Sequence, residues 1–304
     1  MTKKIKQYLA GLMVICFSAL TLSAQEKTVE DYGNYINDKE VTSRITQEAG
    51  ELFDNGSFTG LFKLRQEMDR YKKTAVIYNE EKLAKKATFS FDEHKEGVLI
   101  LAKLYLCDKC PNYHISTATG FVINKDGVGV TNHHVFKKSD NNSTMHLSVY
   151  AVDYEGNVYP VKRVLAGDEL SDLALFKIDT SNELKPLRLG DDLNVGDDLH
   201  LISHPDKRFY YYSHGRMMRQ HTSNKYKSPR QSISADFAKG SSGGPVFNAQ
   251  GEVVGIVTTT NSIYYTPNQN LQMVVKDVIP VSLLKNMIQK DMVTTSIYKG
   301  VPEQ

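Results

Sequence analysis

The sequence predicts an all-β domain, a pair of barrels or a sandwich, preceded by a helical segment. From residue 98 onward, short apolar stretches alternate with turn residues. Residues 25–94 are instead rich in charged, helix-forming residues without strand alternation. With 304 residues, 40% of them hydrophobic, the chain can build one such domain over 95–290, a helical segment and a polar tail over 291–304.

The first 24 residues are expected to form a signal peptide. Lys3, Lys4 and Lys6 precede an apolar stretch over residues 8–22, and Ala24 offers a cleavage site. The alternative is a retained anchor, but this stretch is shorter than the ~20 residues that a spanning helix needs. We therefore expect an exported protein, periplasmic or secreted, with no stable membrane anchor after cleavage.

The helical segment over 25–94 is expected to contain two or three helices. Leu61, Leu64, Met68 and Tyr71 recur at helical spacing, and residues 54–57 (Asp-Asn-Gly-Ser) mark a break. Such an arm packs against the β domain in the simpler interpretation. In the alternative interpretation the arm supports oligomerisation or gates access of substrate, so a homo-oligomer is possible from the sequence.

The strands are expected in two sets, followed by a short helix. The first set covers 98–106, 119–123, 128–131, 147–153, 158–166 and 173–178. The second begins near 199–203 and ends near 271–275, and Pro280 precedes a helix over 281–290.

A run of small residues, Gly240 to Gly244, lies between two strand-like stretches and contains Ser242. A turn of this kind can present a serine hydroxyl beside backbone N–H groups, which is what acyl transfer requires. An ordinary tight turn has the same composition. Two runs upstream favour the catalytic interpretation, because His134 follows Thr131-Asn132-His133 and Asp172 opens a buried strand.

The three motifs T-N-x-H-V, D-L-A-L and G-x-S-G-G, in this order, resemble trypsin-like serine peptidases, most closely the bacterial HtrA/Deg-like branch, over residues 95–288. The resemblance implies a chymotrypsin-like fold of two Greek-key six-stranded β-barrels with the active site between them. It implies Ser242 as nucleophile, His134 as base, Asp172 as the third member, and Gly240 and Ser242 as oxyanion donors. His133 and Asp168 are the competing residues. We expect no PDZ module.

These residue types suit the chemistry. A serine hydroxyl needs a nearby base, a histidine can take and return its proton, and a buried carboxylate fixes the histidine tautomer. The trypsin-like resemblance implies that the base of the first specificity pocket lies six residues before the serine, at Asp236, where a carboxylate would favour Lys or Arg. Asp236 could equally order its loop by accepting backbone hydrogen bonds.

Cys107 and Cys110 are the two cysteines outside the signal segment. In an exported chain we expect a Cys107–Cys110 disulfide. With His114 they also form C-x2-C-x3-H, so a metal site and free or redox-active thiols are alternatives, although no fourth zinc ligand adjoins. We expect no metal and no cofactor.

The sequence thus predicts an exported serine endopeptidase that acts on protein or peptide substrates through an acyl-enzyme. The rival hypothesis is a catalytically silent relative that binds peptides or proteins of the cell envelope. With 37 Lys and Arg against 35 Asp and Glu, the net charge of +2 gives no reason to expect a nucleic-acid partner.

Overall fold

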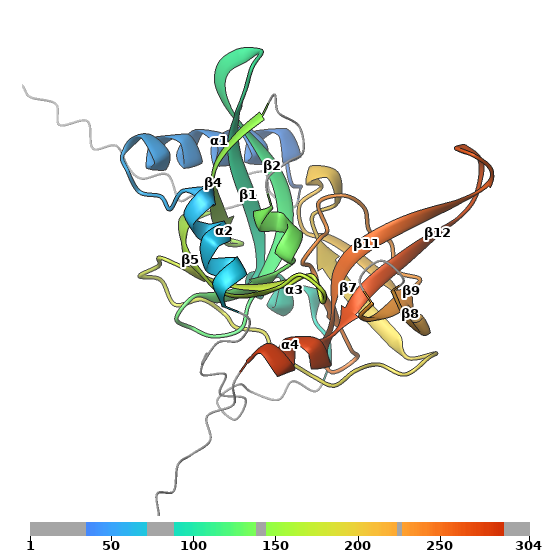
Figure 1. Ribbon diagram of the computed structural model, residues 1–304. Helices are drawn as coiled ribbons and strands as arrows, with labels where there is room; N and C mark the ends of the chain where they lie inside the picture. The colour runs from blue at the N-terminus through green and yellow to red at the C-terminus, as the bar shows by residue number, and fades with distance from the viewer. Residues whose placement is uncertain (1–34, 72–87, 138–143, 224–226, 289–304) are drawn as a thin grey trace, which may run out of the picture.

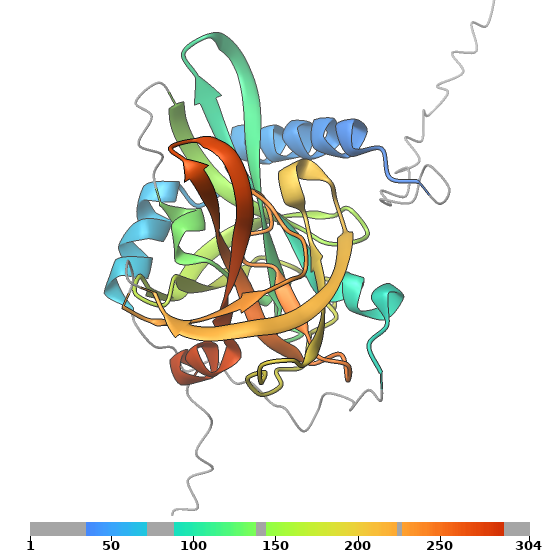
Figure 2. The same cartoon turned by 90° about the vertical axis from the view of Figure 1, so that its right-hand side faces the viewer.

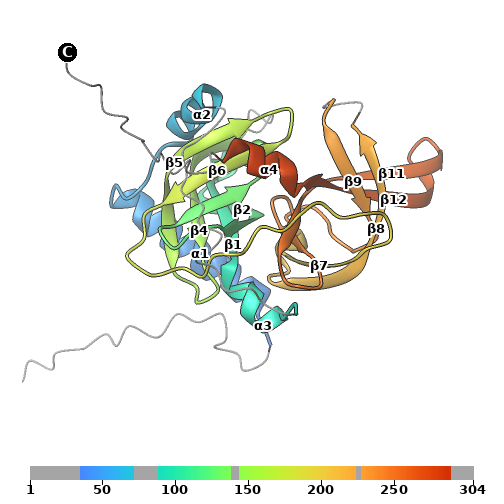
Figure 3. The same cartoon turned by 90° about the horizontal axis from the view of Figure 1, so that it is seen from below.

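Two closed six-stranded antiparallel β-barrels lie side by side in this computed structural model, with helices on their outside (Figure 1, Figure 3). The structure describes residues 35–71, 88–137, 144–223 and 227–288. The expected signal peptide and the polar tail lie outside the described residues. Among the helices that are described, none is long and apolar enough to cross a membrane.

The first barrel is closed by the pairing of its first and fourth strands. Its strands follow one another around the barrel as β1-β2-β3-β6-β5-β4, and β4 returns to pair with β1. The strands are β1 (Val98–Cys107), β2 (Cys110–Val122), β3 (Val128–Thr131), β4 (Thr144–Val152), β5 (Val158–Asp168) and β6 (Leu173–Ile178).

The second barrel repeats this wiring. Its order is β7-β8-β9-β12-β11-β10, with β10 returning to pair with β7, so the Greek-key order of the first barrel recurs strand for strand. The strands are β7 (Asp198–Ser203), β8 (Tyr211–Thr222), β9 (Pro229–Ile233), β10 (Pro245–Phe247), β11 (Val253–Thr266) and β12 (Gln269–Pro280). The predicted fold class, two six-stranded barrels of the chymotrypsin-like kind, is confirmed.

Both faces of β1 are buried, because helices cover what the barrel does not. Leu99 and Leu101 pack in one apolar cluster with α2 (Leu61–Arg70). Val98 and Ile100 point the other way and pack in a second cluster with α1 (Asp38–Asp54). The helical segment is therefore part of the core of the first barrel.

The remaining helices are short. They are α3 (Phe91–His94) and α4 (Val281–Met287), with the 3₁₀ turns η2 (Lys95–Gly97), η3 (His133–Phe136) and η4 (Pro205–Lys207). The final helix is shorter than the predicted 281–290, since it ends at Met287. The strand expected over 119–123 is only the end of the 13-residue β2, because Pro111 and the adjoining turn hide its first half from a period-two pattern.

Candidate active site

His134 and Asp172 form a tight pair at the seam between the barrels. His134 lies on η3, and its Nδ1 is 2.9 Å from Asp172 Oδ2 and 3.1 Å from Oδ1. The backbone N–H of His134 also donates to Oδ1, at 3.1 Å. The Asp172 side chain is 5% exposed and that of His134 is 42% exposed, so the carboxylate is shielded while the imidazole is open to a ligand.

The Thr131-Asn132-His133 run fixes the backbone of Asp172 as well. The Asn132 side-chain amide and the His133 backbone N–H both donate to the Asp172 carbonyl, at 3.0 and 3.1 Å. Asp172 has φ +62°, a left-handed conformation that aspartate tolerates better than most residues. The backbone and the carboxylate of this one residue are thus both held by three consecutive residues.

A residue of the second barrel completes the setting of Asp172. Thr258 is the last residue of the buried part of β11, and its hydroxyl donates to Asp172 Oδ2 at 2.7 Å. Burial is the largest influence on the pKa of Asp172 and acts to raise it. The hydrogen bonds from His134 and Thr258, with the His134 charge, outweigh burial, so the pKa lies below its ordinary value and the carboxyl is ionised at neutral pH.

Ser242 lies on the turn before β10, and backbone contacts from both barrels anchor that turn. The Thr119 N–H of the first barrel donates to the Ser242 carbonyl at 2.9 Å, and the Gly243 N–H donates to Val257 of the second. Gly243 has φ +86°, and a Cβ there would lie 2.3 Å from Thr131 Oγ1, in the run that leads to His134. The turn is therefore pressed against the segments that carry His134 and, through Val257, Thr258.

Gly240 turns its backbone in a way that other residues cannot. It has φ +99°, and a Cβ there would lie 2.4 Å from the His204 carbonyl. The loop 204–210 holds it from behind, since the Asp206 N–H donates to the Lys239 carbonyl at 2.5 Å. Within the described part of the chain, the backbone N–H groups of Gly240 and Ser242 donate to no backbone carbonyl.

His204 stabilises that loop as a buried neutral imidazole. Complete burial lowers its pKa to about 3. The Tyr210 N–H donates to its Nδ1 at 3.0 Å, which places the proton on Nε2. His204 therefore acts structurally rather than as an acid or base.

The two competing residues have other contacts. His133 is 2% exposed, and its ring lies under Gly167 rather than on the Asp172 carboxylate. Asp168 accepts the backbone N–H groups of Leu170 and Ser171, at 3.2 and 3.1 Å. Asp168 thus orders the turn that leads into Asp172. Across the described residues, no hydrogen bond joins the half-buried Ser242 hydroxyl to His134, a contact that in substrate-free enzymes often tightens only on binding.

Asp236 lies away from this cluster of contacts. Its side chain is 75% exposed and pairs with Lys276 at 2.8 Å. Its carbonyl accepts the Ser213 hydroxyl at 2.8 Å. The carboxylate therefore already has a cationic partner, and its role in a specificity pocket stays a prediction.

Cys107 and Cys110 lie at the far end of the β1–β2 hairpin. They are free thiols here, with 3.6 Å between the two sulfur atoms. The predicted disulfide stays a prediction.

Sequence reasoning missed Thr119 and Thr258. Thr119 is fully buried, and its hydroxyl donates to the Gly240 carbonyl at 2.9 Å and accepts from the His204 N–H at 3.2 Å. The one available signal was a hydroxyl residue within or directly after a buried apolar strand.

Comparisons with known proteins agree with this geometry. Residues 118–256 match the family model of the trypsin-like peptidase domain. A probable periplasmic serine endoprotease, DegP-like, of Hahella chejuensis is 31% identical over 189 residues, covering 61% of this chain and 37% of that protein. The chloroplastic protease Do-like 5 of Arabidopsis thaliana is 34% identical over 159 residues, covering 47% and 48%.

A crystal structure of the serine endoprotease from Yersinia pestis covers 66% of each chain at 19% identity, with a TM-score of 0.48. This chain spans less than half the length of the two curated relatives above.

Proposed function

Because the chain contains a trypsin-like peptidase domain with relatives among serine endoproteases, we propose that it is itself an exported serine endopeptidase. The observation that carries the proposal is the His134–Asp172 pair beside the Ser242 turn, in which Asp172 accepts two hydrogen bonds from His134 and three from Asn132, His133 and Thr258. An ordinary loop gains nothing from a buried, fully satisfied carboxylate that faces a solvent-open imidazole.

The proposed reaction is acyl transfer to Ser242 followed by hydrolysis. Asp172 holds Nδ1 of His134, which leaves Nε2 to take the proton from the Ser242 hydroxyl as that oxygen attacks the peptide carbonyl. The N–H groups of Gly240 and Ser242 stabilise the oxyanion. His134 then returns the proton to the leaving amine, and water repeats the cycle to release the acid.

The substrate is proposed to be an extended peptide segment of a protein. β10 pairs with β11 only up to Ile256, whereas β12 continues to pair along the other edge of β11 as far as Thr266. Beyond Thr258, no described strand pairs with the edge of β11 on which β10 lies. This open edge begins at Thr258, whose hydroxyl contacts Asp172. A peptide added there as a strand would lead directly past the His134–Asp172 pair.

Any preference for Lys or Arg before the cleaved bond is proposed to be weak. A substrate cation would have to displace Lys276 from a mostly exposed Asp236 carboxylate, and exposed ion pairs contribute only about 0–1 kcal/mol. We expect Asp236→Ala to change the cleavage preference for basic residues by less than about fivefold, measured on a peptide library. A larger loss of cuts after Lys and Arg would instead place Asp236 in the pocket.

Export is proposed from the predicted signal peptide, together with a relative named as periplasmic. A periplasmic or secreted location is expected, and oligomerisation is open.

The deciding experiment combines a fluorophosphonate label with peptide-library cleavage. We expect the label on Ser242, abolished by Ser242→Ala, and cuts that vanish in the same variant. Ser241→Ala is the matched control, since its buried hydroxyl receives a hydrogen bond from Ser203 and is not the proposed nucleophile. A protein that neither labels nor cleaves, yet binds peptides, would favour the silent binding module.

A further inference from the structure

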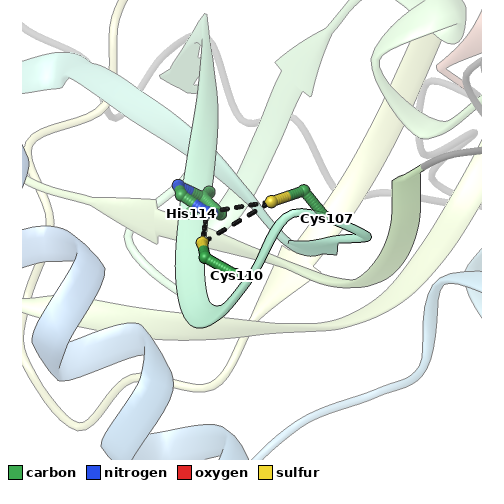
Figure 4. Close-up of side chains that lie close together, drawn as sticks. All are labelled: Cys107, Cys110 and His114. Carbon is green, nitrogen blue, oxygen red and sulfur yellow. Dashed lines mark hydrogen bonds between the residues drawn. The ribbon is translucent and has the colours of Figure 1, made fainter.

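Three potential metal ligands converge at the tip of the β1–β2 hairpin, which projects beyond the first barrel (Figure 1, Figure 2). His114 Nε2 lies 3.4 Å from the Cys107 sulfur and 3.0 Å from the Cys110 sulfur, and the two sulfurs are 3.6 Å apart. Figure 4 shows all three side chains turned toward one another. The proposed peptidase mechanism uses none of them.

These separations are close to the edges of a tetrahedral zinc site. With Zn–S near 2.3 Å and Zn–N near 2.0 Å, an ideal tetrahedron has edges of about 3.8 Å between sulfurs and about 3.5 Å from sulfur to nitrogen. The observed distances fall short of these by at most about half an ångström. Small rotations of half-buried side chains would open the triangle enough to admit an ion.

Backbone irregularity produces the convergence. Cys107 pairs with Cys110 across a two-residue turn, while Leu106 already pairs with Tyr113, so Pro111 and Asn112 are excluded from the ladder. Cys107 and His114 share one face of the hairpin by ordinary alternation, because Tyr105, two residues before Cys107, pairs with His114. The bulge makes Cys110 the residue opposite Cys107, which brings the second sulfur beside the other two side chains.

The imidazole is also fixed from behind. Tyr105 pairs directly with His114, and the two rings stack with centroids 5.3 Å apart and planes at 25°. Ligands held in place before binding lose less entropy when the ion arrives.

We propose that Cys107 Sγ, Cys110 Sγ and His114 Nε2 bind one Zn²⁺ ion, with a water molecule as the fourth ligand. Two thiolates and an imidazole bind Zn²⁺ in preference to the harder Ca²⁺ and Mg²⁺ ions, which prefer oxygen ligands. Binding releases the two thiol protons to solvent and involves no oxidation. Tyr113, which precedes His114 in the same hairpin, donates to Asp54 and packs on Gly50, so the hairpin beside the proposed site already rests against α1.

The test is Co²⁺ and Zn²⁺ titration of the purified protein, reduced with a phosphine and metal-free. We expect one equivalent of Co²⁺ to give thiolate charge-transfer absorption and intense visible bands of four-coordinate cobalt, and Zn²⁺ to bleach both. His114→Gln should weaken Zn²⁺ binding by more than about 100-fold, beyond the 10–100-fold typical of residues that only support a ligand. His214→Gln is the matched control, an exposed histidine on β8.

A Cys107–Cys110 disulfide predicts a different pattern, because it requires no histidine. With one equivalent of Zn²⁺ present, we expect both thiols to resist air oxidation and to react with a thiol reagent only after a chelator is added. The proposal would be overturned if the disulfide formed rapidly in the presence of one equivalent of Zn²⁺. It would also be overturned if His114→Gln bound Zn²⁺ as tightly as the wild type. If Cys107→Ser and Cys110→Ser fold poorly, the cobalt spectrum of the wild type and of His114→Gln still decides.

Discussion

At the scale of single residues, the electrostatics of the candidate site centre on Asp172. Its carboxylate is buried and survives in ionised form because His134 and Thr258 both donate to it. Thr258 comes from the opposite barrel, so this one hydroxyl supplies both a hydrogen bond and a link across the seam. Removing it tests how far the pair depends on the second barrel.

Thr258→Val keeps the side-chain shape and removes the donor. We expect a loss of stability of about 1–3 kcal/mol, because a buried carboxylate is left short of one partner. The pKa of Asp172 should rise. As the pH is lowered, Ser242-dependent cleavage by Thr258→Val should therefore be lost at a higher pH than cleavage by the wild type. Thr260→Val, at an exposed position of the same strand, is the control. Unchanged urea unfolding and an unchanged pH profile in Thr258→Val would contradict this role.

At the scale of elements, the turn that carries the proposed oxyanion donors depends on a neighbouring loop. Residues 204–210 lie behind Gly240, with buried His204 and the Asp206 N–H in contact with the turn. The same loop is tied to the helical segment, since the Phe209 N–H donates to Asp38 at 3.1 Å, at the start of α1. The helical segment thus supports the Ser242 turn of the second barrel as well as packing on the first barrel.

Gly240→Ala should lower kcat by about 10²–10³, the usual effect of losing one oxyanion donor, because a Cβ meets the His204 carbonyl and rotates the peptide. Gly196→Ala is a matched control, since Gly196 has nearly the same φ, +97°, but no atom within 4 Å of the added Cβ. Both variants carry the cost of positive φ. Equal kcat values for the two would show that the clash does not disturb the site.

Sequence patterns predicted the elements and residues whose signal is local. The strand-and-turn periodicity indicated two sets of strands, and three short motifs drew attention to His134, Asp172 and Ser242. Thr258 stayed hidden because its partner is 86 residues away and a hydroxyl after an apolar strand is commonplace. The bulge after Leu106 was equally invisible, because a register shift depends on pairing and not on composition.

At the scale of the whole molecule, the site exists only where the two barrels meet. His134 and Asp172 belong to the first barrel and Ser242 to the second, and each barrel closes its own sheet without the other. The packing of the whole chain also places a neutral histidine at the seam, and this makes global stability depend on pH.

We expect stability to fall as the pH drops from about 6.5 toward 3. Above pH 6.5, the ordinary pKa of histidine, His204 is neutral whether the chain is folded or not. Below it, only the unfolded chain takes up the proton, at a cost to folding of at most about 1.4 kcal/mol per pH unit. Asp172, with its lowered pKa, adds a further loss only below about pH 4.

Thermal unfolding measured across this pH range checks the expectation. His204→Asn keeps an acceptor for the Tyr210 N–H but does not titrate, so its melting temperature should change less with pH. His214→Asn, an exposed substitution, should keep the wild-type slope. If the melting temperature of His204→Asn changed with pH as steeply as that of the wild type, groups other than His204 would be responsible for the acid sensitivity.

The repeated wiring of the two barrels has one more consequence. Because each sheet is closed on itself, a small displacement of one barrel against the other would leave every strand paired. The rate of the proposed reaction would then depend on how the two barrels are aligned, and not only on whether the chain is folded. We therefore expect the proposed peptidase activity to be lost at a lower urea concentration than the folded structure, and to return when the urea is diluted.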